Sequence, residues 1–446
     1  MKTYQLDTPL TDFDEFARLY DGRYNPLIDG SPSDYLLHSI QESVEQEVRE
    51  VILPQFDPAS IKGINVQFGF LYKDRPQAHV KTIGQTDCIG IELGFYSVMF
   101  DLMGRIFADS GCNIFPDGAV ALASTIQNWS ISNRPAVVDS HDSFVFSDSA
   151  TQNHLEYLLL HSHRFLFHHE MAHVWNGHLA LLESNQLEEV ARKIDSSTDI
   201  LRHCFELDAD ARAVHQTMNL ITPCIYNDNR RFYASFGLDN SPIERSIYQG
   251  VFVIYLTMRL LAFLSKTKDP GQTHPSALHR LTWAVELLFT NLTHKSNQYP
   301  PKISQIIFSA VKICERGFCR ITGELSIDIF QSDNLISSNE ARDEILNSWE
   351  KLLPHLQDYK RGIVLPDVRR HGHDSNSVSQ LYEFCQISAR PASLRELFGL
   401  TVSSYSSRIS YFWKCLEIEN FCIRDEHLLA FEAELFKLAP LLESDS

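Results

Sequence analysis

The chain has 446 residues, of which 44% are hydrophobic and 22% charged; this is an ordinary globular composition and excludes a disordered or fibrous protein. The length allows two or three domains with a substantial core. The formal net charge of −18 argues against the basic surface of a general nucleic-acid binder, so we expect no nucleic-acid partner.

We expect a cytosolic protein that does not enter a membrane. The segment Met1–Asp7 lacks the apolar core of a signal peptide. The most apolar stretch, Val251–Leu264, is interrupted by Thr257 and Arg259; it is too short to span a bilayer and is predicted to be a buried helix. Nine cysteines, an odd number without CxxC spacing, are typical of free thiols in a reducing compartment.

The first third of the chain mixes helices and strands. Apolar residues at helical spacing predict a helix over residues 33–53, which Pro54 ends. The segments that follow are expected in this order: strands at Ile64–Tyr72 and Cys88–Gly94 with a polar turn region between them, a helix at Tyr96–Phe107, and short strands or loops at Gly118–Ser124, Pro135–Val138 and Ser143–Phe146.

The next predicted helix carries the most informative motif, His169-Glu170-Met171-Ala172-His173. An apolar stripe over Leu155–Leu166 leads into it, Ser149 is a candidate N-cap and Asn176-Gly177 a suitable exit. Residues four apart lie on one helix face, so the two histidines can present their imidazoles to one metal ion. Glu170 is then placed to act on the attacking water. This is the HExxH arrangement of zinc hydrolases.

Zinc in a catalytic site usually takes a third protein ligand. The metzincin pattern places a histidine six residues after the second motif histidine, whereas His178 follows His173 by five, so that pattern does not fit. A better candidate is Glu206, in a segment of good helix formers whose small alanines would let it approach the first helix. We predict Glu206 as the third ligand and Asp210, four residues on, as the carboxylate that orients a ligand histidine through its other ring nitrogen.

Other histidines are weaker candidates. His161, His163 and His168 lie on the motif helix but have no Glu-x-x-His continuation, and His168 is expected to pack or to meet solvent. The stretch His371-Gly372-His373-Asp374 is interpreted as part of a polar loop.

After Asp210 the sequence is almost wholly helical. Helices are predicted near residues 198–218, 244–266, 275–292, 303–316 and 339–358, with a break at Pro300-Pro301, a mixed region containing a hairpin at Gly317–Asn334 and a polar loop near 365–378. We divide the chain into an N-terminal helical segment (1–60), a metallopeptidase core (61–300) and an accessory helical domain (320–446). The accessory domain would gate the site or bind a regulatory protein partner.

Three blocks of the sequence resemble a known group of enzymes. They are His169-Glu170-x-x-His173, Glu206-x-x-Ala209-Asp210, and His274-Pro275 followed by Arg280. In order and local spacing they are similar to the gluzincin metallopeptidases of the HtpX and CAAX-prenyl-protease type, over about residues 150–290. Those relatives are commonly membrane-embedded or exported. A looser resemblance is to soluble bacterial peptidases, namely the phage-exclusion peptidase Lit and the ImmA-type repressor-cleaving proteins.

The resemblance and the predicted elements together imply an α+β fold, mostly helical, with a gluzincin-like core and a small mixed sheet, followed by the C-terminal helical domain that the later sequence predicts. It places His274 and Arg280 near the zinc, where they would stabilise the oxyanion or hold the site carboxylates. In gluzincins an edge strand beside the motif helix commonly holds the substrate in extended form, and either Cys88–Gly94 or Ser143–Phe146 would do this here.

The favoured hypothesis is a soluble endopeptidase with one Zn²⁺, held by His169, His173 and Glu206. Glu170 would act as general base on the attacking water and then pass the proton to the leaving amine of a protein or peptide substrate. One alternative is a non-catalytic sensor or interaction module with a structural or vestigial metal site. Another is a latent peptidase that is regulated in stress response or phage defence.

Overall fold

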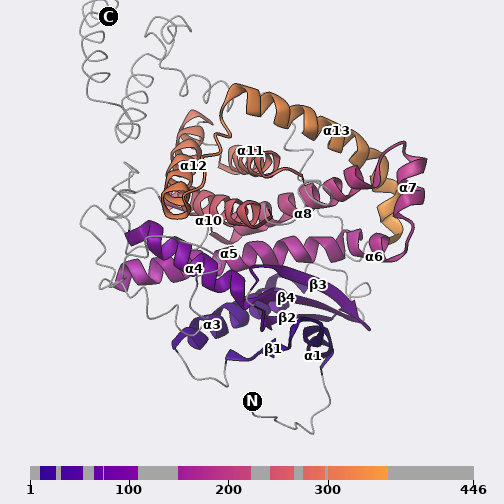
Figure 1. Cartoon of the computed structure of the whole chain (residues 1–446), viewed down its shortest axis with the longest axis horizontal. Helices are drawn as coiled ribbons and strands as arrows, with labels where there is room; N and C mark the ends of the chain where they lie inside the picture. The colour runs from indigo at the N-terminus through magenta and orange to yellow at the C-terminus, as the bar shows by residue number, and fades with distance from the viewer. Residues whose placement is uncertain are drawn as a thin grey trace, which may run out of the picture.

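The computed structural model describes residues 11–26, 32–53, 65–73, 75–108, 149–221, 242–265, 275–296 and 300–359. Within them the protein is mostly helical with one small four-stranded mixed sheet, which confirms the predicted fold class. In Figure 1 the helix α5 lies between the sheet on one side and a stack of helices on the other, so it is covered from both sides. The motif predicted to bind metal is on this central helix.

The sheet has the order β1-β2-β4-β3. Its strands are β1 (Arg23–Tyr24), β2 (Asn65–Leu71), β3 (Ala78–Ile83) and β4 (Thr86–Glu92). β2 and β4 are parallel, and the other two pairs are antiparallel. All residues of β4 are buried, as expected for a strand that is paired on both sides and covered on both faces.

β2 and β4 confirm the two predicted strands, but the polar turn region expected between them is wrong. It contains β3, whose residues are all half-buried or exposed and whose sequence therefore shows no clean apolar alternation. The proposal that Cys88–Gly94 holds substrate is also wrong. Those residues fall mainly in β4, which has partners on both sides, whereas β3 is the edge strand of the described sheet. The other candidate, Ser143–Phe146, lies outside the described residues, as do 118–124 and 135–138.

Two short N-terminal elements that the sequence did not predict cover one face of the sheet. They are α1 (Asp12–Ala17) and the 3₁₀ turn η1 (Arg18–Tyr20). Phe13 of α1 lies directly on Gly69 of β2, where an added Cβ would come within 2.7 Å of the ring. Glycine is required there by this close approach. Residues 89 and 91 of β4 point to the opposite face and join the main core.

The main core is built by helices. α3 (Pro32–Glu47) continues into the π-helical turn η2 (Val48–Ile52), which confirms the helix predicted over 33–53. α4 (Leu93–Ala108) follows β4 directly. Beyond α5 (Ser149–Trp175) lie α8 (Thr198–Ile221), α10 (Pro242–Ser265), α11 (Ala277–Ser296) and α12 (Pro300–Thr322), with the short helices α6 (His178–Glu183) and α7 (Leu187–Lys193) joining α5 to α8.

The apolar helix α10 is longer than predicted. A window of 20 residues, Arg245–Leu264, has a mean hydropathy of 1.7 and is long enough to cross a membrane, so the argument that this stretch is too short is wrong. However, 83% of its most apolar 18-residue window is buried inside the fold, as in the core helix of a globular protein. The prediction of a buried helix is therefore confirmed.

The prediction of a hairpin at Gly317–Asn334 is wrong. As for α10, the length of the preceding helix was underestimated. α12 runs on to Thr322, and the described segment from there to α13 (Ser332–Leu356) contains no strand. Trp349 of α13 packs in a core cluster with Phe205 of α8, and the 3₁₀ turn η7 (Gln357–Tyr359) follows.

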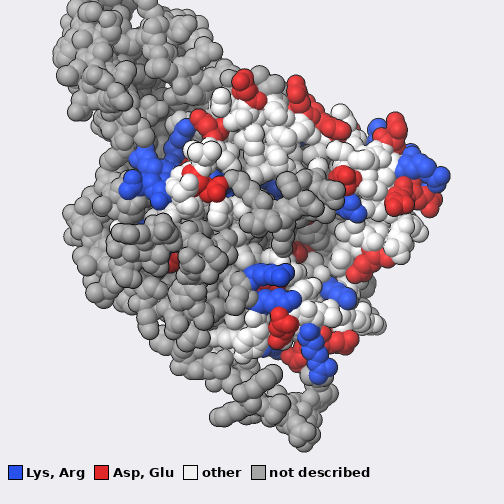
Figure 2. Space-filling view, viewed as in Figure 1, with Lys and Arg blue, Asp and Glu red and all other residues white. Residues whose placement is uncertain are grey.

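The accessory domain at 320–446 stays a prediction, because residues beyond 359 are outside the described part of the chain, including the loop near 365–378. Figure 2 shows acidic side chains along the outer edge formed by α13. The exposed acidic residues of this helix are Asp333, Glu340, Asp343, Glu344 and Glu350.

Candidate metal centre

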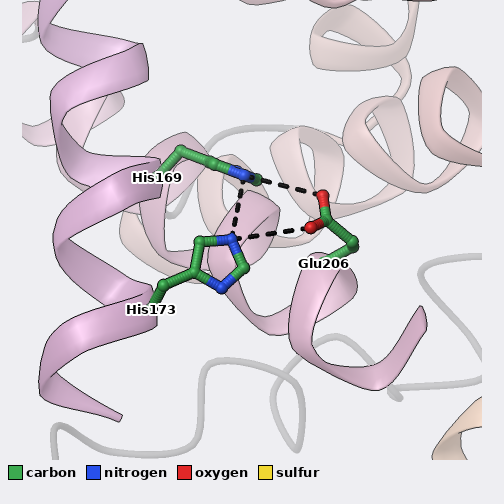
Figure 3. A group of neighbouring side chains, drawn as sticks. All are labelled: His169, His173 and Glu206. Carbon is green, nitrogen blue, oxygen red and sulfur yellow. Dashed lines mark hydrogen bonds and ion pairs between the residues drawn. The ribbon is translucent and has the colours of Figure 1, made fainter. Parts of the chain in front are cut away.

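The two motif histidines lie one turn apart near the C-terminal end of α5. Their rings point to the same side of the helix, toward α8 (Figure 3). The His169 and His173 Nε2 atoms are 3.2 Å apart. α5 ends at Trp175, and Gly177 then adopts a left-handed backbone with φ of 82°, as predicted for an Asn-Gly exit. The rigid, largely buried position of the motif follows from the packing of α5 against the sheet and α8.

Glu206 of α8 completes a group of three potential metal ligands. Its Oε2 is 3.6 Å from His169 Nε2 and its Oε1 is 3.6 Å from His173 Nε2. Ligands about 2.0–2.2 Å from a tetrahedral ion lie roughly 3.3–3.6 Å from one another. The three atoms thus have the spacing and the chemistry, two imidazole nitrogens and one carboxylate oxygen, of a divalent metal site. Ala209 and Ala213 are fully buried, which lets α8 approach α5 as the sequence suggested.

Asp210 lies behind His169, as predicted for an orienting carboxylate. Its Oδ1 is 2.9 Å from His169 Nδ1, so the other ring nitrogen faces the metal position. Burial opposes a charged imidazole, but the hydrogen bond to Asp210 and the nearby carboxylate charges outweigh it and raise the pKa of His169. Burial likewise opposes ionisation of Asp210, yet Arg280 and His169 keep the pKa of this carboxyl below its usual range.

Arg280 binds the carboxylates of the site. Its guanidinium donates to both oxygens of Asp210, at 2.8 Å and 2.6 Å, and lies 3.5 Å from Glu206 Oε2. Although burial favours the neutral form, these carboxylates raise the pKa of Arg280 and keep it charged. Of the two roles that the sequence suggested for Arg280, the contacts fit the holding of carboxylates. His274 lies outside the described residues, so its role stays a prediction.

The neighbour of His173 is His178. The sequence analysis rejected His178 as a third ligand and gave it no other role. His178 Nδ1 lies 3.3 Å from His173 Nδ1, and His178 Nε2 lies 3.2 Å from Asp208 Oδ2. Asn176 Nδ2 donates to the same Asp208 oxygen at 2.5 Å. Burial, only partly offset by the charge of Glu206, lowers the pKa of His173 to about 3. The ring is therefore neutral at pH 7, as a metal ligand must be.

A second group missed by the sequence analysis comes from the N-terminal elements. Tyr20 of η1 stacks on His79 of β3 with ring centroids 4.1 Å apart, and His79 Nε2 lies 2.7 Å from Glu92 Oε1. Burial, and after it the charges of Glu170 and Glu92, raises the pKa of Tyr20. The phenol is thus within electrostatic reach of the predicted base. No local motif marks it, because η1 and α5 are far apart in sequence.

The remaining histidines of α5 are structural. His163 is fully buried between aromatic rings and contacts the Leu159 carbonyl at 2.8 Å; burial lowers its pKa to about 4. Burial also lowers the pKa of His161 well below its ordinary value. His168 is buried and pairs with Glu47 of α3 at 2.9 Å, which agrees with the expectation that it packs away from the metal.

The geometry can now be set beside known proteins. Residues 119–299 match the Peptidase U49 family. The match covers less than half of the chain but includes the HExxH motif, Glu206, Asp210 and Arg280. Peptidase U49 is the family of the Lit-type peptidases, so the match supports the looser of the two resemblances seen in the sequence. It indicates a peptidase, and the His/His/Glu group fits a metallopeptidase. Neither a curated protein nor a solved structure matches the chain.

Proposed function

We propose that the protein is a zinc-dependent endopeptidase. The observation that carries the proposal is the convergence of His169, His173 and Glu206 on one point (Figure 3), with Glu170 directly after His169 on α5. Two imidazoles and one carboxylate form the ligand set of gluzincin-type catalytic zinc, and such a set leaves one position open. When bound there, Zn²⁺ supplies Lewis acidity, which activates water and polarises the scissile carbonyl at neutral pH.

The residues of this chain have separable roles in the proposal. Glu170 accepts a proton from the attacking water and delivers it to the leaving amine. Asp210 holds the ring of His169, and Arg280 keeps Asp210 ionised and holds both Asp210 and Glu206 in place. His274, from the same sequence block as Arg280, remains in the proposal as a group that stabilises the developing oxyanion.

The structure offers a strand for the substrate. β3 is an edge strand and packs against α5, so an extended peptide added to its open side would run past the motif. Tyr20 and His79 lie at this edge and would form part of the substrate-binding wall. Main-chain pairing would hold the peptide, because backbone N–H and C=O groups on an edge strand are available to a further strand. We place the enzyme in the cytosol, with protein substrates.

The test compares the purified parent chain with Glu170→Gln and His173→Ala. We expect about one tightly held zinc per parent chain, the same content in Glu170→Gln, and loss of zinc in His173→Ala. Cleavage of an unstructured protein should fall by about 10²–10⁴-fold in Glu170→Gln, because the base is lost while the ligands remain.

The same variants expressed in cells would be compared by mapping new protein termini. Termini that depend on Glu170 in cells, without cleavage by the purified zinc-loaded chain, would identify a latent, regulated peptidase. A parent chain without stoichiometric metal, or cellular effects that persist in Glu170→Gln, would overturn the proposal in favour of a non-catalytic interaction module.

A further inference from the structure

The two ligand histidines are supported in different ways. His169 has the Asp210 carboxylate directly at its Nδ1, at 2.9 Å. At the Nδ1 of His173 the neighbour is a second imidazole, that of His178, at 3.3 Å. His178 is fully buried, and its far nitrogen lies 3.2 Å from the Asp208 carboxylate. A chain of polar contacts therefore runs from Asp208 through His178 to His173.

Proton placement along this chain is dictated by the metal position. His173 Nε2 faces Glu206 and His169, so this nitrogen must carry a lone pair for the metal and the proton must be on Nδ1. His173 Nδ1 then donates to His178 Nδ1, which in turn must be the unprotonated nitrogen of that ring. The proton of His178 is then on Nε2, the nitrogen that faces the Asp208 carboxylate at 3.2 Å. One arrangement of protons satisfies all three groups.

We propose that His178 and Asp208 are positioning residues that fix the tautomer and the ring orientation of His173 for metal binding. Asp210 does this for His169 in one step, and Asp208 does it for His173 through an intervening imidazole. The inference rests on the proposed metal site and adds residues to it that are not ligands. His178 acts through His173 and does not itself reach the ion.

The surroundings of His178 are built to hold its ring. The left-handed Gly177 turns the chain back so that the first residue of α6 faces the end of α5. The His178 ring stacks on Phe205 at 4.6 Å and meets the Trp349 ring edge-on at 5.9 Å. Asn176 donates to Asp208 and fixes the carboxylate. Of these, the Trp349 contact links the metal site to α13, a helix far along the chain.

Zinc affinity of the purified full chain, measured by competition with a chelator, provides the test. Phenylalanine at position 178 keeps the aromatic stack but accepts no hydrogen bond, so His178→Phe should bind zinc about 10–100-fold more weakly. Asp208→Asn keeps an oxygen that can accept from His178 but loses the charge, so it should weaken zinc binding by less. The glutamine side-chain oxygen can accept a hydrogen bond from His173 Nδ1–H, so His178→Gln should lose less zinc affinity than His178→Phe. The matched control is His163→Phe, a buried histidine of α5 away from the metal site, which should keep the parent affinity.

A second readout does not need metal. In the zinc-free chain, ¹⁵N shifts of the His173 ring should report the Nδ1–H tautomer in the parent and a mixture of tautomers in His178→Phe and Asp208→Asn. Thermal melts identify variants that fail to fold, in which case Asp208→Asn and His178→Gln carry the comparison.

Equal zinc affinity in the parent, His178→Phe and Asp208→Asn, or an equal loss in His163→Phe, would overturn the positioning role while leaving the peptidase proposal intact. A parent chain that binds no zinc would instead overturn the proposed function, and the tautomer measurement would still decide whether Asp208 acts on His173.

Discussion

Two groups of buried polar residues in this protein differ in whether they contain their own counter-charge. The first joins α10 to α12: Glu315 accepts from Arg259 Nε at 2.9 Å, from the Tyr255 hydroxyl at 2.9 Å and from the Ile327 amide at 2.7 Å. Arg259 also donates to the Leu325 carbonyl at 3.1 Å. This group contains both its anion, Glu315, and its cation, Arg259, and the two side chains hydrogen-bond to each other.

At the candidate metal centre, by contrast, the potential ligand atoms of three residues converge on one point. The Nε2 atoms of His169 and His173 and the Glu206 carboxylate oxygens face one another at 3.2–3.6 Å, and the Nδ1 atoms of the two rings contact Asp210 and His178. Three lone pairs in contact repel unless a cation lies between them. Burial alone therefore does not distinguish a structural polar group from a functional one. The two are distinguished by whether the polar atoms bind one another, as in the first group, or converge on one point, as in the second.

The largest effect is expected from breaking the first group. Arg259→Met leaves the Glu315 carboxylate buried without its cation, and this should lower the free energy of unfolding by about 3–5 kcal/mol. Because the group contains its own counter-charge, the loss should be the same with and without zinc. Chemical denaturation of the parent and the variant, each in zinc and in chelator, measures both quantities.

The informative control is the double variant Arg259→Met/Glu315→Leu, which removes the stranded charge together with its partner. It should recover part of the lost stability, since an apolar pair in place of a buried ion pair is often tolerated. A loss in Arg259→Met that zinc reverses would contradict the distinction drawn between the two groups.

The second prediction concerns the metal centre itself. Zinc at about 100 times its dissociation constant should raise the free energy of unfolding of the parent by about 2.7 kcal/mol, because it binds only the folded chain. Glu206→Gln weakens the third ligand, so this increment should shrink or vanish. Arg259→Met should keep it in full. Denaturation midpoints in zinc and in chelator provide the measurement, and an equal increment in Glu206→Gln would remove Glu206 from the ligand set.

The sequence predicts the grouping of His169, His173 and Glu206 because its signals are local. His169 and His173, and again Glu206 and Asp210, are four residues apart on helices that a clear apolar pattern marks. Their distances within each helix follow from helix geometry alone. That the two helices meet was inferred from the small residues of α8, and the buried Ala209 confirms the reasoning.

The features that the sequence did not predict depend on tertiary contacts between distant segments or on segments with a weak hydrophobic pattern. β3 was missed because a short edge strand with half-buried residues has no clean period of two. Tyr20 reaches the site only through the packing of η1 on β3. The contact of His178 with His173 depends on the turn at Gly177 and on Asp208 of another helix, neither of which appears in the spacing of the motif.

The smallest predicted effect tests that turn. Gly177 has φ of 82°, and an added Cβ would lie 2.8 Å from the backbone carbon of Tyr359. Gly84 has φ of 60°, and among the described residues, its chain neighbours aside, no atom lies within 4 Å of an added Cβ. Alanine at either position adopts a left-handed backbone at a cost of roughly 1–2 kcal/mol in the free energy of unfolding. Gly177→Ala should cost more than Gly84→Ala because Tyr359 must also move.

Gly177→Ala should in addition weaken zinc binding, since the turn places His178 behind His173, while Gly84→Ala should leave zinc affinity unchanged. Denaturant unfolding and chelator competition on both variants decide the point: equal effects at the two glycines would mean that the turn after α5 contributes only backbone strain and does not position the metal ligands.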